Sequence, residues 1–223
     1  MLEIKRFVFG PFETNCYVVS LNDKMVNEQM VLVVDPACAY ESEQQQLLTY
    51  IENQKSKIKN LQLSIVATHG HLDHLWGAAW ACAKWNTPVL MHEADIPMAK
   101  AMQSQYDLFG IRAKAQPFPI EDIKSKIKNH KFEISNFQLL ETPGHTPGSI
   151  CLYFNTPSSS HLSPFILSGD TLFQMGYGRT DLPGGNFSQL IDSLDRLFAL
   201  PPETVVYPGH GAPTTIAAER RRW

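Results

Sequence analysis

The chain has 223 residues, enough for one domain with a sizeable hydrophobic core. Apolar residues make up 43%, charged residues 18%, and the net charge is −3, so the composition indicates neither a nucleic-acid-binding protein nor a membrane-surface protein. No segment approaches the roughly 20 apolar residues of a membrane-spanning helix, and residues 1–12 lack the apolar core of a secretory signal. We therefore expect a cytoplasmic, single-domain protein over residues 1–223.

Alternating and β-branched runs predict strands, and apolar residues at helical spacing predict helices. The expected strands cover residues 3–9, 15–21, 30–34, 63–67, 88–91, 138–141, 150–154, 165–167 and 204–207. The expected helices cover residues 41–53, 75–85 and 187–197. This alternation predicts an α/β or α+β fold with central sheets.

Two further segments and the cysteines complete the outline. Residues 22–29 are predicted to connect a hairpin, and residues 158–163 to form a polar turn. Residues 97–131 are the least periodic part of the chain, and two interpretations stay open for them: a lid over the site or a plain surface excursion. The cysteines are widely spaced without a CxxC pair, which is typical of reduced, buried thiols: Cys16, Cys38, Cys82 and Cys151.

Three predicted strands end in glycine-rich turns that carry histidine or aspartate. The strand before residue 68 leads into His69, and the strands before residues 168 and 208 lead into Asp170 and His210. Strand ends on a rigid scaffold are common positions for functional side chains. These ends are therefore expected to converge on one site.

The segment from Thr68 to His74 reads His-x-His-x-Asp-His after its threonine, with ligand-type side chains at His69, His71, Asp73 and His74. Imidazole nitrogen and carboxylate oxygen bind zinc and iron readily. A turn between a strand and a helix is able to spread four such groups around two adjacent ions. His145, Asp170 and His210 each lie in a glycine or proline turn further along and extend the predicted ligand set.

These motifs together resemble the metallo-β-lactamase superfamily and, within it, the short bacterial glyoxalase II-like (hydroxyacylglutathione hydrolase-like) proteins. The resemblance runs from residue 14 to residue 216 and implies an αββα sandwich of two mixed β-sheets flanked by helices. It also implies two divalent metal ions, zinc foremost, with iron or manganese as alternatives. The implied first-metal ligands are His69, His71 and His145; the second-metal ligands are Asp73, His74 and His210; and Asp170 bridges both ions. True β-lactamases lack this bridging aspartate, so Asp170 argues against antibiotic hydrolysis.

The resemblance implies hydrolysis of a small thioester, such as S-lactoylglutathione, by a hydroxide held between the two ions. A thiolate leaving group needs little protonation, so no separate general acid is assigned. Asp73 is expected to orient the nucleophile as well as to bind metal. Arg179 matches a basic substrate-contact position, although a pairing with Asp181 that braces the loop is equally open.

Two other functions were considered for the same motifs, and neither of them is hydrolysis. A persulfide dioxygenase-like oxidoreductase would use one iron held by His69, His145 and Asp170, a two-histidine, one-carboxylate set, although residues 182–185 depart from that subgroup. A non-catalytic binding module is disfavoured, because a complete set of unused polar ligands is costly to keep. The helical C-terminal domain of longer glutathione-thioester hydrolases is expected to be absent, since only residues 211–223 follow His210. The acyl group, the native metal and the oligomeric state stay open.

Overall fold

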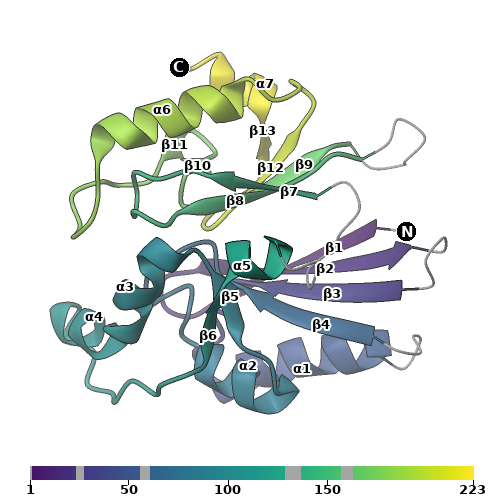
Figure 1. Cartoon of the computed structure of the whole chain (residues 1–223), viewed down its shortest axis with the longest axis vertical. Helices are drawn as coiled ribbons and strands as arrows, with labels where there is room; N and C mark the ends of the chain where they lie inside the picture. The colour runs from purple at the N-terminus through teal and green to yellow at the C-terminus, as the bar shows by residue number, and fades with distance from the viewer. Residues whose placement is uncertain (1, 24–27, 56–60, 129–136, 157–162) are drawn as a thin grey trace. The chain divides into compact units, whose positions relative to one another are not determined.

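The computed structural model describes residues 2–23, 28–55, 61–128, 137–156 and 163–223 (Figure 1). Two units can be distinguished by their internal contacts. Unit 1 comprises Met1–Ala67, His71–Leu90 and Met98–Glu121, and unit 2 comprises Thr68–Gly70, Met91–Pro97 and Asp122–Trp223. The His-x-His-x-Asp-His motif is thus divided after Gly70, at a single peptide bond.

A six-stranded sheet with the order β1-β2-β3-β4-β5-β6 dominates the first half of the chain. Its strands are β1 (Leu2–Phe9), β2 (Thr14–Asp23), β3 (Glu28–Val34), β4 (Leu61–Val66), β5 (Val89–Met91) and β6 (Ile120–Asp122). The first three strands pair antiparallel, and β3, β4 and β5 pair parallel. The antiparallel pairing of Asp23 with Glu28 confirms the predicted hairpin, whose residues 24–27 lie outside the described residues.

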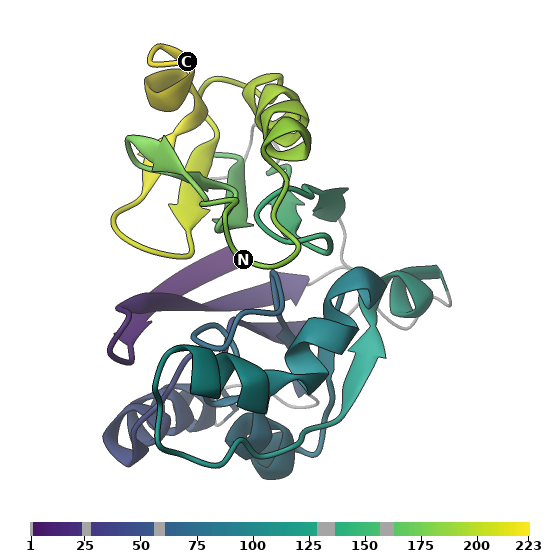
Figure 2. The same ribbon diagram turned by 90° about the vertical axis from the view of Figure 1, so that its left-hand side faces the viewer.

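Parallel neighbours need crossover connections, and two helices supply them. Helix α1 (Glu41–Lys55) joins β3 to β4, and α2 (Ala78–Trp85) joins β4 to β5. The two helices lie on one side of the sheet in both ribbon views (Figures 1 and 2). Leu47 and Ile51, one helical turn apart on α1, are fully buried. Helix α2 begins three residues later than predicted because residues 72–77 form turns, with Gly77 N–H donating to the Pro36 carbonyl.

A five-stranded sheet with the order β13-β12-β9-β8-β7 forms the centre of unit 2. Its strands are β7 (Phe137–Glu141), β8 (Ile150–Phe154), β9 (Phe165–Gly169), β12 (Val205–Pro208) and β13 (Thr214–Thr215). Strand β12 runs parallel to β9, and the other pairs are antiparallel. A hairpin of β10 (Leu172–Phe173) and β11 (Gly176–Tyr177) follows β9.

The core of unit 2 lies between its sheet and helix α6 (Phe187–Phe198). Leu190, Leu194 and Leu197 repeat at helical spacing, are fully buried and pack with Cys151 and Ile166 of the sheet. Asn186 caps the start of the helix, because its side chain accepts a hydrogen bond from the Gln189 amide. A second helix, α7 (Ile216–Arg220), packs into the same core through Ile216. Two mixed sheets with flanking helices confirm the predicted α/β class.

Residues 97–128 belong to the least periodic part of the sequence, yet they lie in regular elements. They form α3 (Ile96–Lys100), α4 (Met102–Leu108), β6 and α5 (Ile123–Lys128), preceded by the 3-10 turn η1 (Glu93–Asp95). Met102 and Tyr106 anchor α4 as buried side chains. Residues 158–162 of the predicted polar turn lie outside the described part of the chain. The same holds for His130 and His161, two histidines outside the ligand motifs. Among the described residues, no helix has both the length and the hydropathy needed to cross a membrane.

Candidate metal centre

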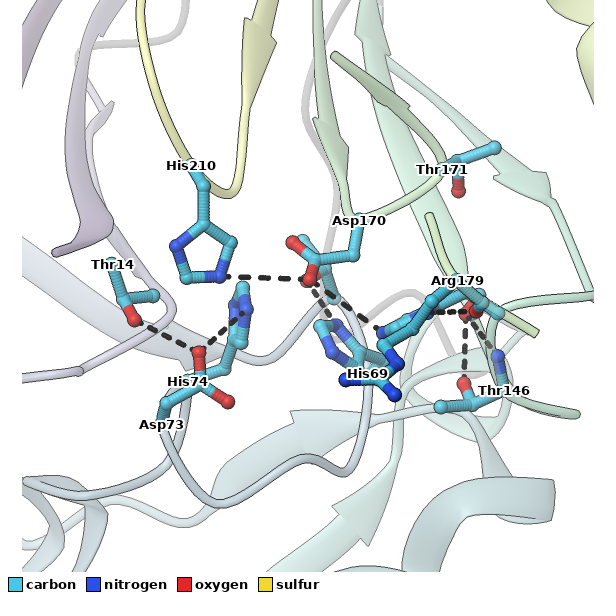
Figure 3. Close-up of polar contacts among 12 residues, drawn as sticks. Thr14, His69, Asp73, His74, Thr146, Asp170, Thr171, Arg179 and His210 are labelled. Carbon is cyan, nitrogen blue, oxygen red and sulfur yellow. Dashed lines mark hydrogen bonds and ion pairs between the residues drawn. The ribbon is translucent and has the colours of Figure 1, made fainter. Parts of the chain in front are cut away.

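Unit 2 contains four of the predicted ligands, the Asp170 carboxylate and the imidazoles of His69, His145 and His210 (Figure 3). Oδ2 of Asp170 lies 3.6 Å from Nε2 of His145 and 3.6 Å from Nε2 of His210. The rings of His69 and His145 meet edge to face with their centroids 4.8 Å apart. A carboxylate oxygen that is flanked by two imidazole nitrogens has the geometry of a group that shares cations with both of them.

The ring of His145 is oriented by a hydrogen bond from its other nitrogen. Its Nδ1 lies 2.7 Å from the carbonyl oxygen of Arg179. A carbonyl only accepts, so Nδ1 carries the proton and Nε2 keeps the lone pair that a metal ligand requires. His69 has a comparable contact, with its Nδ1 3.1 Å from the hydroxyl oxygen of Thr68. Both rings therefore have a defined orientation before any ligand binds.

The turn that presents Asp170 depends on a glycine. Gly169 has a φ of +50°, and a Cβ placed there would lie 2.5 Å from Oγ1 of Thr68, the residue before His69. Glycine adopts this conformation without steric cost and leaves room for the close approach. The Gly209 amide donates to the Gly169 carbonyl at 2.7 Å, which ties the turn of Asp170 to the turn of His210.

The β10–β11 hairpin follows Asp170 directly and is anchored at its tip. The amide of Met175 donates to Oε2 of Glu219 at 2.9 Å. Glu219 is buried, and its other oxygen accepts from Thr214 Oγ1 at 2.6 Å and from Arg222 Nη1 at 2.8 Å. The ring centroids of Phe173 and His210 lie 6.2 Å apart. The charged run of residues 219–222 predicts the end of a surface helix, and the burial of Glu219 corrects this prediction for that residue.

Unit 1 carries the other donors of the motif, His71, Asp73 and His74, on one loop. His74 is fully buried, with Nδ1 3.0 Å from Oδ2 of Asp35 and Nε2 3.4 Å from Oδ2 of Asp73. The hydroxyl of Thr14 donates to the same Asp73 oxygen at 2.9 Å (Figure 3). An aspartate behind a histidine fixes the ring and raises its basicity as a ligand. Neither Asp35 nor Thr14 was predicted to contact these side chains, although the family resemblance begins at residue 14.

Arg179 and Asp181 form a bidentate ion pair, with Nε to Oδ1 at 2.7 Å and Nη2 to Oδ2 at 2.6 Å. Both side chains are exposed. The hydrogen bonds from the guanidinium lower the pKa of Asp181 from its ordinary 3.8 to about 2. This is the bracing contact considered for Arg179, and the assignment of Arg179 to substrate binding stays a prediction.

The four cysteines are free and buried, as predicted. Burial raises the pKa of Cys38 to about 12 and that of Cys151 to about 11. Burial also raises the pKa of Cys82 to about 11 and the pKa of Cys16 well above its ordinary value. Each thiol is therefore protonated near neutral pH, and none of them is a thiolate nucleophile.

Two solved structures have a similar fold. TTHA1623, described in a di-iron-bound form, is 30% identical with a TM-score of 0.76, and the match covers 97% of each chain. ETHE1 from Myxococcus xanthus is 26% identical with a TM-score of 0.63, covering 98% of this chain and 82% of that one.

Sequence comparison gives relatives over nearly the whole chain. The probable metallo-hydrolase YqgX of Bacillus subtilis is 33% identical over 97% of this chain and 93% of its own length. The hydroxyacylglutathione hydrolase GloC of Haemophilus influenzae is 30% identical over 94% of this chain and 91% of its own length. The sequence profile of the metallo-beta-lactamase superfamily matches residues 9–210. The chain therefore belongs to the metallo-β-lactamase superfamily.

Proposed function

We propose that this protein is a dinuclear metal-dependent hydrolase of a small thioester such as S-lactoylglutathione. The observation that carries the proposal is the position of the Asp170 carboxylate, whose Oδ2 is equidistant from His145 and His210 at 3.6 Å. His210 lies outside the two-histidine, one-carboxylate set of a mononuclear iron site, so its approach to Asp170 supports a second ion. The similarity to a hydroxyacylglutathione hydrolase supports the thioester as substrate.

The ligand assignment follows the family pattern. We propose His69, His71 and His145 for the first ion, Asp73, His74 and His210 for the second, and Asp170 for both. The donor set of imidazole nitrogens and carboxylate oxygens fits zinc, iron and manganese. Support comes from His145 and His74, each of which has its Nδ1 directed at an oxygen and so presents Nε2 as the donor. Two bound cations would supply an activated water and polarise the thioester carbonyl.

The chain's own groups have limited further tasks in this reaction. Asp73, whose Oδ2 accepts from Thr14, orients the attacking water in this proposal. The departing thiolate is a stable anion and needs no donor acid. The buried, protonated cysteines offer no competing nucleophile. We also propose that the chain acts as one domain, residues 1–223, on a small molecule in the cytoplasm.

A second candidate activity is a persulfide dioxygenase-like oxidation at one iron. It is favoured by the grouping of His69, His145 and Asp170 within unit 2, which is a two-histidine, one-carboxylate set. The likeness to ETHE1 from Myxococcus xanthus keeps this candidate in view.

The first test is hydrolysis of S-lactoylglutathione by protein loaded separately with zinc, iron or manganese, followed as loss of thioester absorbance. We expect kcat/KM above about 10⁴ M⁻¹s⁻¹, the range of ordinary enzymes, with two metal ions bound per chain. A single bound iron, with oxygen uptake on a glutathione persulfide and negligible thioester hydrolysis, would instead establish the oxygenase.

Asp170→Asn tests the dinuclear assignment directly. The amide is a poorer ligand than the carboxylate and places an N–H₂ group between two imidazoles, so we expect fewer than two ions per chain. We also expect kcat/KM to fall by on the order of 100-fold or more. Substituting a residue that only orients a metal ligand already costs about 10- to 100-fold, and Asp170 is proposed as a ligand itself. Metal analysis and the thioester assay give the two readouts. Asp192→Asn, on the exposed side of α6, is the matched control. Full metal content and turnover in Asp170→Asn would contradict the proposal.

A further inference from the structure

Asp95 joins two ligand-bearing loops within unit 2. Its Oδ2 accepts from the Gly70 amide at 2.8 Å and from Thr146 Oγ1 at 2.6 Å, and its Oδ1 accepts from the Gly148 amide at 2.7 Å. Gly70 directly follows His69, and Thr146 directly follows His145. Asp95 is itself fully buried. One carboxylate thus fixes the backbone beside two of the predicted ligands.

The position of Asp95 is itself well determined. It closes the η1 turn, and its amide donates to the carbonyl of His92 at 3.0 Å. His92 caps the turn through Nδ1, which accepts from the Ala94 amide at 3.2 Å. His92, outside every ligand motif, therefore has a structural role, and the carboxylate of Asp95 extends from a rigid turn.

The surroundings of this carboxylate specify aspartate. All three groups that contact the Asp95 carboxylate, two backbone amides and one hydroxyl, are hydrogen-bond donors. Because Thr146 donates its hydroxyl proton to Asp95, Ser149 must be the donor in the 2.7 Å contact between the Thr146 and Ser149 hydroxyls. An asparagine would direct an N–H₂ group at one of these donors. The Asp95 side chain also packs closely against Gly148, where a Cβ would lie only 2.7 Å from Cγ of Asp95. A side chain longer than aspartate at position 95 would therefore have no room.

We propose that Asp95 is a positioning residue that sets the spacing of His69 and His145 before metal binds. The proposal rests on the metal centre assigned above and goes beyond it, since Asp95 is not itself a ligand. The two rings stand 4.8 Å apart between centroids, and the His145 ring is fixed from its other side by the Arg179 carbonyl. Ligands held in place in this way lose little further freedom on binding a cation, whereas a shift of about 1 Å in either loop would misplace a nitrogen.

The test must separate positioning from mere stabilisation, because three buried hydrogen bonds also stabilise the fold. Cobalt titration of the metal-free protein gives binding constants and a visible spectrum that reports ligand geometry without any substrate. For Asp95→Asn we expect cobalt affinity to fall about 10- to 100-fold, as for other groups that orient ligands, with a changed spectrum. At saturating metal, kcat should fall while KM stays within about twofold, as expected for lost transition-state geometry.

The matched control is Glu43→Gln. The Glu43 carboxylate likewise accepts three hydrogen bonds, all of them from backbone amides: Gly10 at 2.8 Å, Ala39 at 2.8 Å and Tyr40 at 3.1 Å. None of these residues adjoins a predicted ligand. Glu43→Gln should lower the unfolding midpoint and leave the cobalt spectrum and affinity unchanged.

A second pair of variants covers the case in which Asp95→Asn does not fold. Thr146→Val removes one donor to Asp95 at nearly constant volume, and Thr146→Ser restores it. Weaker cobalt binding in the valine variant and recovery in the serine variant support positioning. Unchanged cobalt affinity and spectrum in the valine variant, with lowered stability only, overturn it. Wild-type protein that binds cobalt but hydrolyses no thioester would refute the proposed function alone, whereas wild-type protein that binds no cobalt would refute both.

Discussion

The imidazoles of His74 and His145 each have an oxygen close to Nδ1, and this contact selects the tautomer of the neutral ring. Asp35 holds His74 at 3.0 Å, and the Arg179 carbonyl holds His145 at 2.7 Å. A proton on Nδ1 directs the lone pair of the neutral ring to Nε2. The chain therefore selects the tautomer by fixed acceptors, one a side chain and one a backbone carbonyl.

The ion pair of Arg179 with Asp181 allows the substrate role of the arginine to be tested. The pair is exposed, so it contributes little net free energy and a substrate carboxylate is able to replace Asp181. If Arg179 contacts substrate, Arg179→Ala should raise KM for an anionic thioester several-fold, and Asp181→Asn, which releases the guanidinium, should lower it. Steady-state kinetics of both variants decide the matter. Equal losses of stability with KM unchanged in both would leave the arginine with a bracing role only.

The acidity of Asp181 fixes the pH range in which this test is valid. Its pKa is lowered from 3.8 to about 2 by the hydrogen bonds from Arg179. The pair's contribution to stability is therefore fully present above about pH 3.8 and is lost as the pH falls through about 2. The comparison of KM values near neutral pH consequently needs no correction for titration of this carboxylate.

The sequence identified candidate ligands and missed the residues that hold them, for a physical reason. His69, Asp170 and His210 became candidates because each lies in a local glycine-rich turn at a strand end. The contact of Thr14 with Asp73 spans 59 positions in the chain, and that of Asp95 with Gly148 spans 53. Contacts of this range are created by tertiary structure and leave no local pattern to read.

Helices and strands that are long enough to show a repeating pattern of hydrophobic residues were predicted well. The buried strands β8 and β9 and the amphipathic helix α6 lie within one or two residues of their expected positions. Strands β10 and β11 have two residues each, and α3 has five, too few to show either periodicity. The start of α2 was misplaced because Leu72 and Leu75 are apolar and buried although they lie in turns.

Helix α6 offers a test at this scale. Asn186 caps it by accepting from the Gln189 amide at 3.1 Å. Asn186→Ala leaves that amide without this acceptor, and we expect a loss of about 1 kcal/mol in the free energy of unfolding. Urea denaturation with a common m-value measures it. Asn186→Asp keeps an acceptor and should retain most of the stability; an aspartate variant as unstable as the alanine variant would show that the cap is not the cause.

At the scale of the whole molecule, metal occupancy should govern thermal stability. A ligand that binds only the folded chain, present at 100 times its dissociation constant, adds about 2.7 kcal/mol. For a chain of this size that corresponds to a rise in Tm of roughly 5–10 °C. We expect EDTA to lower Tm by this amount and added metal to restore it, as measured by scanning calorimetry. Asp170→Asn should show a smaller shift, and an unchanged Tm in the wild-type protein would contradict metal binding.

The anchoring of the β10–β11 hairpin by Glu219 has a practical consequence for anyone who shortens or extends this protein. Deleting the residues from 219 onward would remove the acceptor of the Met175 amide. It would also remove Trp223, whose ring lies 5.8 Å from that of Tyr177 at the end of β11. Trimming the terminus would thus loosen the segment that begins just after Asp170, and an activity lost on truncation would be wrongly blamed on a missing catalytic group. A purification tag is better appended after Trp223 through a spacer than exchanged for the last helical turn.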